Sequence, residues 1–249
     1  MNLKVTNTPA EFEALAQTDL SQTTCVVLDI LRATSSIVTA LANGAEKIIP
    51  VATIEEALAE KTDHPEALLA GERDGLRITA EQAGGTDFDL GNSPREYTAE
   101  IVSGKTIITT TTNGTRALRA CADAQCTLVA SFLNLRATTD HLRASPPANL
   151  VIVCGGTYEE AALEDALAAG AISDALWDLY EVGTEDSAQV VRHLHMKIGQ
   201  DLEAAMCFAR NGRHLLSQAS LKADVKACVQ SNAHHLVARL VDNAVCCQS

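Results

Sequence analysis

Asp29 is the residue whose type and setting in this sequence most strongly suggest chemistry. It lies in the apolar run Val26–Leu31, which is typical of a buried strand, and Arg32 follows directly. A buried carboxylate must be paired, hydrogen-bonded or bound to a metal ion, because an isolated buried charge is costly. Two interpretations stay open: a structural ion pair with Arg32 or Arg73, or a functional acid at a ligand site.

A second acid–arginine pair, Glu72 and Arg73, follows the apolar run Ala67–Ala70. Arginine offers two parallel hydrogen bonds to a phosphate group, and carboxylates are the hard oxygen ligands that Mg²⁺ prefers. The acid–arginine pairs therefore favour a phosphate held by arginine together with Mg²⁺. A surface network of ion pairs is the alternative. Two further carboxylates, Glu164 and Asp165, follow the last predicted strand.

A run of hydroxyl side chains, Thr109–Thr112, leads into Asn113, Gly114 and Thr115. Hydroxyls and backbone N–H groups at the start of a helix can hold an anion, and a glycine lets the backbone come close to it. The alternative is an ordinary helix cap, since threonine and asparagine favour that position anyway.

Several known phosphate-binding and hydrolase motifs are absent from the sequence. It has no G-x-x-x-x-G-K-[ST] loop, no G-x-G-x-x-G after a strand and no G-x-S-x-G elbow. Haloacid-dehalogenase phosphatases resemble D-x-D-x-[TV] after the first strand, but here Leu31 stands where the second aspartate should be. The sequence does not support any of these classes.

Charge and composition limit the partners. The 249 residues include 19 Lys and Arg against 32 Asp and Glu, a formal net charge of -13. Such a chain repels nucleic acid phosphates, and an anionic substrate would need local arginines, N–H groups or a divalent cation. No apolar run is long enough to span a membrane, and the N-terminus has no apolar signal core. We therefore expect a cytoplasmic protein with no nucleic-acid or membrane partner.

Strands that alternate with helices must position these polar residues. Apolar runs predict strands at 26–31, 47–51, 67–70, 106–109, 127–130 and 150–153. Capping signals predict helices at 35–43, from 53, at 94–102 and at 113–121, and the chain is expected to be mostly helical from about 159 to its end. This alternation predicts a single α/β domain over residues 1–249 with a largely parallel or mixed sheet. Ligands bind at the carboxyl ends of strands in such sheets.

The cysteines and histidines give weaker evidence about function than the acids and arginines. Eight cysteines form no C-x-x-C pair and several lie in apolar runs, which favours reduced thiols in a core; a redox role for Cys246 and Cys247 is the alternative. Among the late histidines, His214 is the better candidate for a proton donor or anion contact, if the helical half folds over the sheet.

Four segments, taken in order, resemble the 2-phosphosulfolactate phosphatase (ComB) family. They are Asp29–Thr34, Gly71–Arg73, Phe88–Pro94 and Thr110–Thr115. The later stretch from Glu164 to Gly170 also resembles the family, so the similarity covers most of the chain.

The resemblance implies a Mg²⁺-dependent phosphatase that cleaves 2-phosphosulfolactate to sulfolactate and phosphate, a step of coenzyme M biosynthesis in methanogens. It also implies a three-layer α/β/α fold and a cytoplasmic enzyme. The expected partner is therefore an anionic phosphorylated small molecule, and a homodimer is left open.

These arguments assign expected roles. Candidate catalytic residues are Asp29, Arg32, Glu72 and Arg73. Candidate metal ligands are Asp29, Glu72 and Asp165. Candidate substrate-binding residues are Thr34, Asn92, Ser93, Thr111, Thr112, Asn113, Gly114 and Thr115. Asp29 could bind the metal ion that activates an attacking water, or it could itself be the nucleophile and form an aspartyl-phosphate. The sequence does not separate the two routes. The alternative function is a non-catalytic binding protein for a phosphorylated anionic metabolite.

Overall fold

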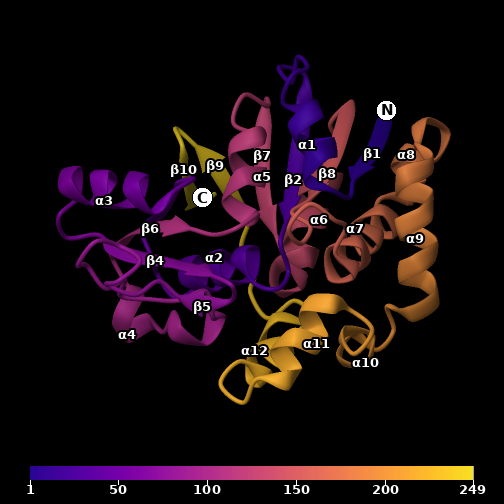
Figure 1. The fold of residues 1–249 in the computed structure, drawn as a ribbon. Coiled ribbons are helices and arrows are strands. Elements are labelled where there is room, and N and C mark those ends of the chain that lie inside the picture. The colour runs from indigo at the N-terminus through magenta and orange to yellow at the C-terminus, as the bar shows by residue number, and fades with distance from the viewer. Residues whose placement is uncertain (249) are drawn as a thin grey trace.

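A mixed sheet runs through the centre of the fold (Figure 1). The structure, a computed structural model, describes residues 1–248, and within them the sheet has ten strands in the order β1-β8-β2-β7-β9-β10-β3-β6-β4-β5. The strands are β1 (Asn2–Thr6), β2 (Thr23–Leu28), β3 (Lys47–Pro50), β4 (Leu68–Arg73), β5 (Leu76–Arg77), β6 (Thr106–Thr110), β7 (Cys126–Ala130), β8 (Asn149–Cys154), β9 (Ala238–Val241) and β10 (Ala244–Cys247).

Two groups of parallel strands make up most of this sheet. One group is β1-β8-β2-β7 and the other is β3-β6-β4, and the antiparallel hairpin β9–β10 lies between them. The hairpin meets β3 through a single register pair, Val245 with Ile48. Because the pairings β7–β9, β9–β10 and β10–β3 are all antiparallel, the two groups run in opposite directions. Figure 1 shows them as two differently oriented halves of the molecule.

Helices cover the sheet and dominate the second half of the chain. The α-helices are α1 (Pro9–Leu15), α2 (Ala33–Ala42), α3 (Ile54–Asp63), α4 (Ala99–Val102), α5 (Gly114–Ala120), α6 (Leu135–Ala144), α7 (Leu163–Ala175), α8 (Trp177–Tyr180), α9 (Asp186–Ile198), α10 (Leu202–Met206), α11 (Arg210–Ser217) and α12 (Lys222–Cys228). Short 3₁₀ turns are η1 (Pro94–Glu96), η2 (Phe132–Asn134) and η3 (Glu181–Gly183).

The strand β2 is buried on both faces, as parallel strands between helical layers are. Val26 and Leu28 join a core that includes residues of α7, α9 and α11. Cys25 and Val27 point the other way, into a core that includes residues of α1, α2 and α5. This arrangement confirms the α/β class, the mixed and mostly parallel sheet and the helix-rich C-terminal region.

Three local expectations were wrong. The strand β2 ends at Leu28, so Asp29 follows the strand instead of lying inside it. The helix expected over 94–102 is interrupted at Tyr97, between η1 and α4. Residues 238–247 form a β-hairpin, although the end of the chain was expected to be helical. Its turn residues Asp242 and Asn243 both have positive φ, 47° and 62°, which suits a two-residue hairpin turn.

The remaining global features are simple. Among residues 1–248, no helix is long and apolar enough to cross a membrane. All eight cysteines are free thiols, and Cys25, Cys121, Cys154 and Cys228 are buried.

Gly170→Ala is expected to destabilise the protein, although alanine is the better helix former by about 1 kcal/mol. Helices α7 and α9 pack closely at this glycine, and a Cβ there would lie 2.1 Å from the Val191 carbonyl oxygen. Forcing the helices apart should cost about 1–3 kcal/mol. Urea unfolding measures the change, and an unchanged or higher free energy of unfolding would show that the helices are not in close contact here.

Candidate active site

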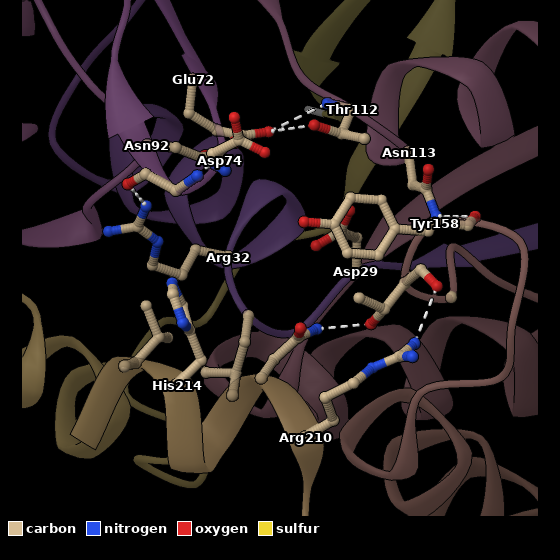
Figure 2. Close-up of a pocket in the computed structure, with 16 residues that line it drawn as sticks. Asp29, Arg32, Glu72, Asp74, Asn92, Thr112, Asn113, Tyr158, Arg210 and His214 are labelled. Carbon is tan, nitrogen blue, oxygen red and sulfur yellow. Dashed lines mark hydrogen bonds between the residues drawn. The ribbon is translucent and has the colours of Figure 1, made fainter. Parts of the chain in front are cut away.

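A cavity of about 310 Å³ lies where the ends of both strand groups meet the C-terminal helices (Figure 2). Asp29 follows β2, Glu72 lies near the end of β4 and Thr112 follows β6. Gly156 follows β8, and α11 contributes Arg210 from the opposite wall. The carboxyl ends of four strands therefore converge on one cavity, the usual place for ligands in α/β sheets.

Asp29 is held by its own loop but keeps one oxygen free. Its Oδ1 accepts a hydrogen bond from the Ala33 N–H at 3.1 Å. The Thr34 hydroxyl accepts from the Asp29 N–H and donates to the Asp29 carbonyl, both at 3.0 Å. Among residues 1–248, no group donates a hydrogen bond to Oδ2. The space beside Oδ2 exists because residue 114 is glycine, where a Cβ would lie 2.8 Å from Oδ2 and 2.5 Å from the Ala33 Cβ.

The environment of Asp29 disfavours its negative charge. Burial is the main cause and raises the pKa of the carboxyl to about 7, with nearby Glu72 and Glu164 adding to the effect. The Ala33 N–H and the charge of Arg32 oppose the shift. A carboxyl with a pKa near neutrality can exchange a proton or accept a cation under ordinary conditions.

Glu72 connects two of the strand ends that form the cavity. Its Oε1 accepts from the Thr112 N–H at 2.9 Å and from the Thr112 hydroxyl at 3.0 Å, and its Oε2 accepts from the Gly75 N–H at 2.8 Å. Its neighbour Arg73 does not line the cavity. The Arg73 guanidinium instead donates to the Glu72 carbonyl at 2.6 Å and to the Thr110 hydroxyl at 3.0 Å.

Arg32 lines the cavity but is also tied into the protein. It donates to Asp224 Oδ2 at 2.6 Å and to the Gly75 carbonyl at 2.5 Å. Asp224 also accepts from the Ser93 hydroxyl at 2.7 Å, so Ser93 faces Asp224 and does not line the cavity. The structural alternative for Arg32 thus involves Asp224 on α12 and not Asp29.

Asp165 does not line the cavity. Its Oδ1 accepts from the Ile30 N–H at 2.8 Å and its Oδ2 from the Gly156 N–H at 3.0 Å. Burial raises the pKa of the Asp165 carboxyl well above its usual range, and the charges of Asp29 and Glu164 raise it further. Asp165 therefore fastens together the loops that follow β2 and β8.

The predicted substrate-binding residues separate into two groups. Those that line the cavity are Asn92, Thr112 and Asn113. Those that do not are Thr34, Ser93, Thr111, Gly114 and Thr115. Thr111 and Thr115 form a cap at the start of α5, where the Thr115 N–H donates to the Thr111 hydroxyl at 3.2 Å.

Several cavity residues had not been assigned from the sequence. They are Asp74, Gly75, Thr157, Tyr158, Arg210 and Asn211. Helix α11 also supplies His214. The helical half of the chain therefore covers the strand ends, which is the condition under which His214 was a candidate for a proton donor or anion contact. Asn211 donates to Glu164 Oε1 at 2.7 Å and to the Thr157 hydroxyl at 2.6 Å, which fixes α11 to the loop after β8. The glycines and threonine directly after β8 were the available signal for this loop.

The carboxylates that face the cavity determine where a metal ion could bind. Among residues 1–248, no group of three or more His, Cys, Asp or Glu side chains is arranged to hold a metal ion. Asp29, Glu72 and Asp74 do line the cavity. Mg²⁺ is commonly held by one or two carboxylates together with substrate phosphate oxygens and water. The free oxygen of Asp29 fits that mode. Glu72 faces the same cavity, although both of its oxygens already accept hydrogen bonds, whereas Asp165 does not line the cavity.

Known proteins similar to this chain share one description. The model of the 2-phosphosulpholactate phosphatase family matches residues 10–243. A probable 2-phosphosulfolactate phosphatase of Caldanaerobacter subterraneus subsp. tengcongensis is 38% identical over 238 residues, which cover 94% of each chain. Proteins of the same description from Thermotoga petrophila and Clostridium acetobutylicum are 39% and 35% identical and cover 88% and 89% of this chain, and 89% and 91% of their own length.

Asp29→Asn is expected to stabilise the metal-free fold at neutral and higher pH. In the unfolded chain an aspartate loses its proton near pH 4, whereas the folded pKa is about 7. The stability of the wild type therefore falls as the pH rises through this interval and levels off above it. The advantage of the variant should grow over the same range, up to about 4 kcal/mol.

Urea unfolding at pH 5 and pH 8 with chelator measures this advantage. Asp178→Asn is the matched control, because Asp178 forms an exposed ion pair with Arg143 and its effect should stay constant over this range. An advantage of Asp29→Asn that is equal or smaller at pH 8 would contradict a raised pKa of the half-buried Asp29 carboxyl.

Proposed function

The chain belongs to the 2-phosphosulfolactate phosphatase family, and from this premise we propose that it is a Mg²⁺-dependent phosphatase that hydrolyses 2-phosphosulfolactate to sulfolactate and phosphate. The family makes it a phosphoric monoester hydrolase. The observation that best supports the proposal is the free Oδ2 of Asp29, which faces the same cavity as Arg32. We further propose that the chain forms a single domain and that the enzyme is cytoplasmic. In organisms that make coenzyme M, we propose that it acts in the biosynthesis of that coenzyme.

The cavity offers both signs of charge to such a substrate. Arg32 and Arg210 lie on its walls with His214, and the Asn92 side chain also faces it. These donors suit phosphoryl, sulfonate and carboxylate oxygens, because arginine pairs with such groups through two hydrogen bonds. These local cationic side chains offset the long-range repulsion that a chain with net charge -13 exerts on an anionic substrate.

The chemistry assigned to Asp29 follows from its free oxygen and its raised pKa. In one route Asp29 attacks phosphorus, the P–O bond to the sulfolactate oxygen breaks, and water then hydrolyses the aspartyl-phosphate. In the other route water attacks directly and Asp29 takes up its proton. In both routes one water is consumed and the leaving alkoxide ends as a hydroxyl.

Arg32 and Asn92 are assigned to the phosphoryl oxygens and would stabilise their charge during transfer. When bound at Asp29 and Glu72, Mg²⁺ would offset the remaining charge of those oxygens. Asp165 and Glu164 are assigned no contact with the substrate; they hold the loops that shape the cavity.

The alternative is a binding protein for a phosphorylated anionic metabolite. The same cavity residues would serve it, but Asp29 would then need no free oxygen beside the phosphate. Ligand would raise the melting temperature of a binding protein without any release of phosphate.

Phosphate release should depend on a divalent cation. A panel of phosphorylated 2-hydroxy acids, with 2-phosphosulfolactate among them, is assayed for inorganic phosphate with Mg²⁺ or with chelator. We expect release that is fastest for 2-phosphosulfolactate and lost on chelation. Full activity in enzyme shown by elemental analysis to be metal-free would rule out the metal. Thermal stabilisation by the panel without phosphate release would support the binding protein instead.

Arg32→Lys should lower kcat/KM strongly, by roughly 2–4 kcal/mol of transition-state stabilisation. Lysine keeps the positive charge but loses the planar fork that fits a phosphoryl group. Arg143→Lys is the matched control, because Arg143 also forms a two-bonded pair, with Asp178 on the surface. If Arg32→Lys lowers the melting temperature but leaves kcat/KM of the folded enzyme intact, then Arg32 is structural.

A further inference from the structure

Asp224 on helix α12 is a completely buried carboxylate that lies behind the cavity. Its side chain has 0% exposure, and the cavity wall does not include it. In Figure 1, α11 and α12 lie together beyond the strand ends, far along the chain from β2. A buried carboxylate on a short helix requires partners, and those partners show what the helix does at this place.

All the partners of Asp224 come from the segments that border the cavity. Arg32 donates to Oδ2 at 2.6 Å, Ser93 donates to Oδ1 at 2.7 Å, and Arg95 reaches Oδ1 at 3.4 Å. Arg32 is itself only 3% exposed, so this pair is shielded from solvent and its geometry is well fixed.

The pair also determines what Arg32 does not contact. Arg32 is near enough to Asp29 for its charge to act there, yet no hydrogen bond joins the two side chains within residues 1–248. The guanidinium instead bridges Asp224 and the Gly75 carbonyl. Without Asp224, the Asp29 carboxylate is the nearby anion that could capture Arg32.

We propose that Asp224 is a positioning residue that holds the Arg32 guanidinium toward the phosphate and away from Asp29. The inference rests on the proposed phosphatase function. Helix α12 then contributes to catalysis through one buried ion pair, and Ser93 supports it by fixing the other oxygen of Asp224. Of Asp224, Ser93 and Arg32, only Arg32 touches the substrate.

A double-mutant cycle tests this role. Asp224→Asn keeps the shape of the side chain and removes its charge, and we expect kcat/KM to fall about 10²-fold, as misplacement by about 1 Å can cause. In the Arg32→Lys background the same change should cost less than about 3-fold, because the fork that Asp224 orients is already missing. Asp178→Asn, which breaks the surface pair with Arg143, should leave kcat/KM unchanged in both backgrounds.

A purely structural Asp224 predicts a different result, namely an equal fold-loss in the wild-type and Arg32→Lys backgrounds. That outcome would overturn the inference, as would unchanged kinetics of folded Asp224→Asn. If circular dichroism shows that Asp224→Asn does not fold, Ser93→Ala replaces it, with an expected loss of about 3–10-fold that again disappears beside Arg32→Lys. Equal losses for Ser93→Ala in both backgrounds would contradict the inference.

Wild-type turnover separates this inference from the proposed function. If the wild type releases no phosphate from any ester, the phosphatase proposal fails, and the same cycle is measured on the Kd of inorganic phosphate by calorimetry. Coupling between Asp224 and Arg32 in that Kd would support the positioning role without catalysis. A wild type that neither hydrolyses esters nor binds phosphate would overturn both.

Discussion

The uncompensated carboxylate of Asp29 is the constraint on which the rest of the site depends. Burial and neighbouring acids raise its pKa to about 7, and one of its oxygens has no donor among residues 1–248. Folding alone gives no reason to keep such a group, because a half-buried carboxylate that is not paired with a cation costs stability. The nearest arginine, Arg32, is directed to Asp224 instead. The fold thus leaves one carboxylate oxygen of Asp29 without a donor where an ordinary ion pair with Arg32 could have formed.

This arrangement requires residues from the whole chain. The two parallel strand groups run in opposite directions, and a hairpin formed near the C-terminus joins them. Glu72 links β4 to the loop after β6, and Asp165 links the loops after β2 and β8. Helices α11 and α12 complete the cavity and hold Arg32. Glu72, Asp165 and Asp224 each accept hydrogen bonds from other segments, so part of the excess of acid in the composition is structural.

The sequence predicted the parts of the site that follow from local order. Glu72 and Thr112 could be placed together because each follows an apolar run and β4 and β6 are parallel neighbours. Asp29 also follows an apolar run, but β2 belongs to the oppositely directed strand group, so its meeting with Glu72 depends on the tertiary fold. Adjacent residues of a strand face opposite sides, which explains why Glu72 faces the cavity and Arg73 does not. Asp224 and Arg210 could not be predicted, because their positions depend on how distant helices pack. The hairpin turn at Asp242 and Asn243 carried a local signal that the helical reading overlooked.

Turnover by Asp29→Asn tests the central claim most directly. The variant keeps the size of the side chain and removes the charge, while the hydrogen bond from Ala33 to the remaining oxygen can persist. With Mg²⁺ and 2-phosphosulfolactate, the account predicts a fall in kcat/KM of roughly 10³-fold, within the range for loss of a group that attacks or takes up a proton, with the circular dichroism spectrum unchanged. Near-normal turnover by the folded variant would contradict it and would make Asp29 a structural acid.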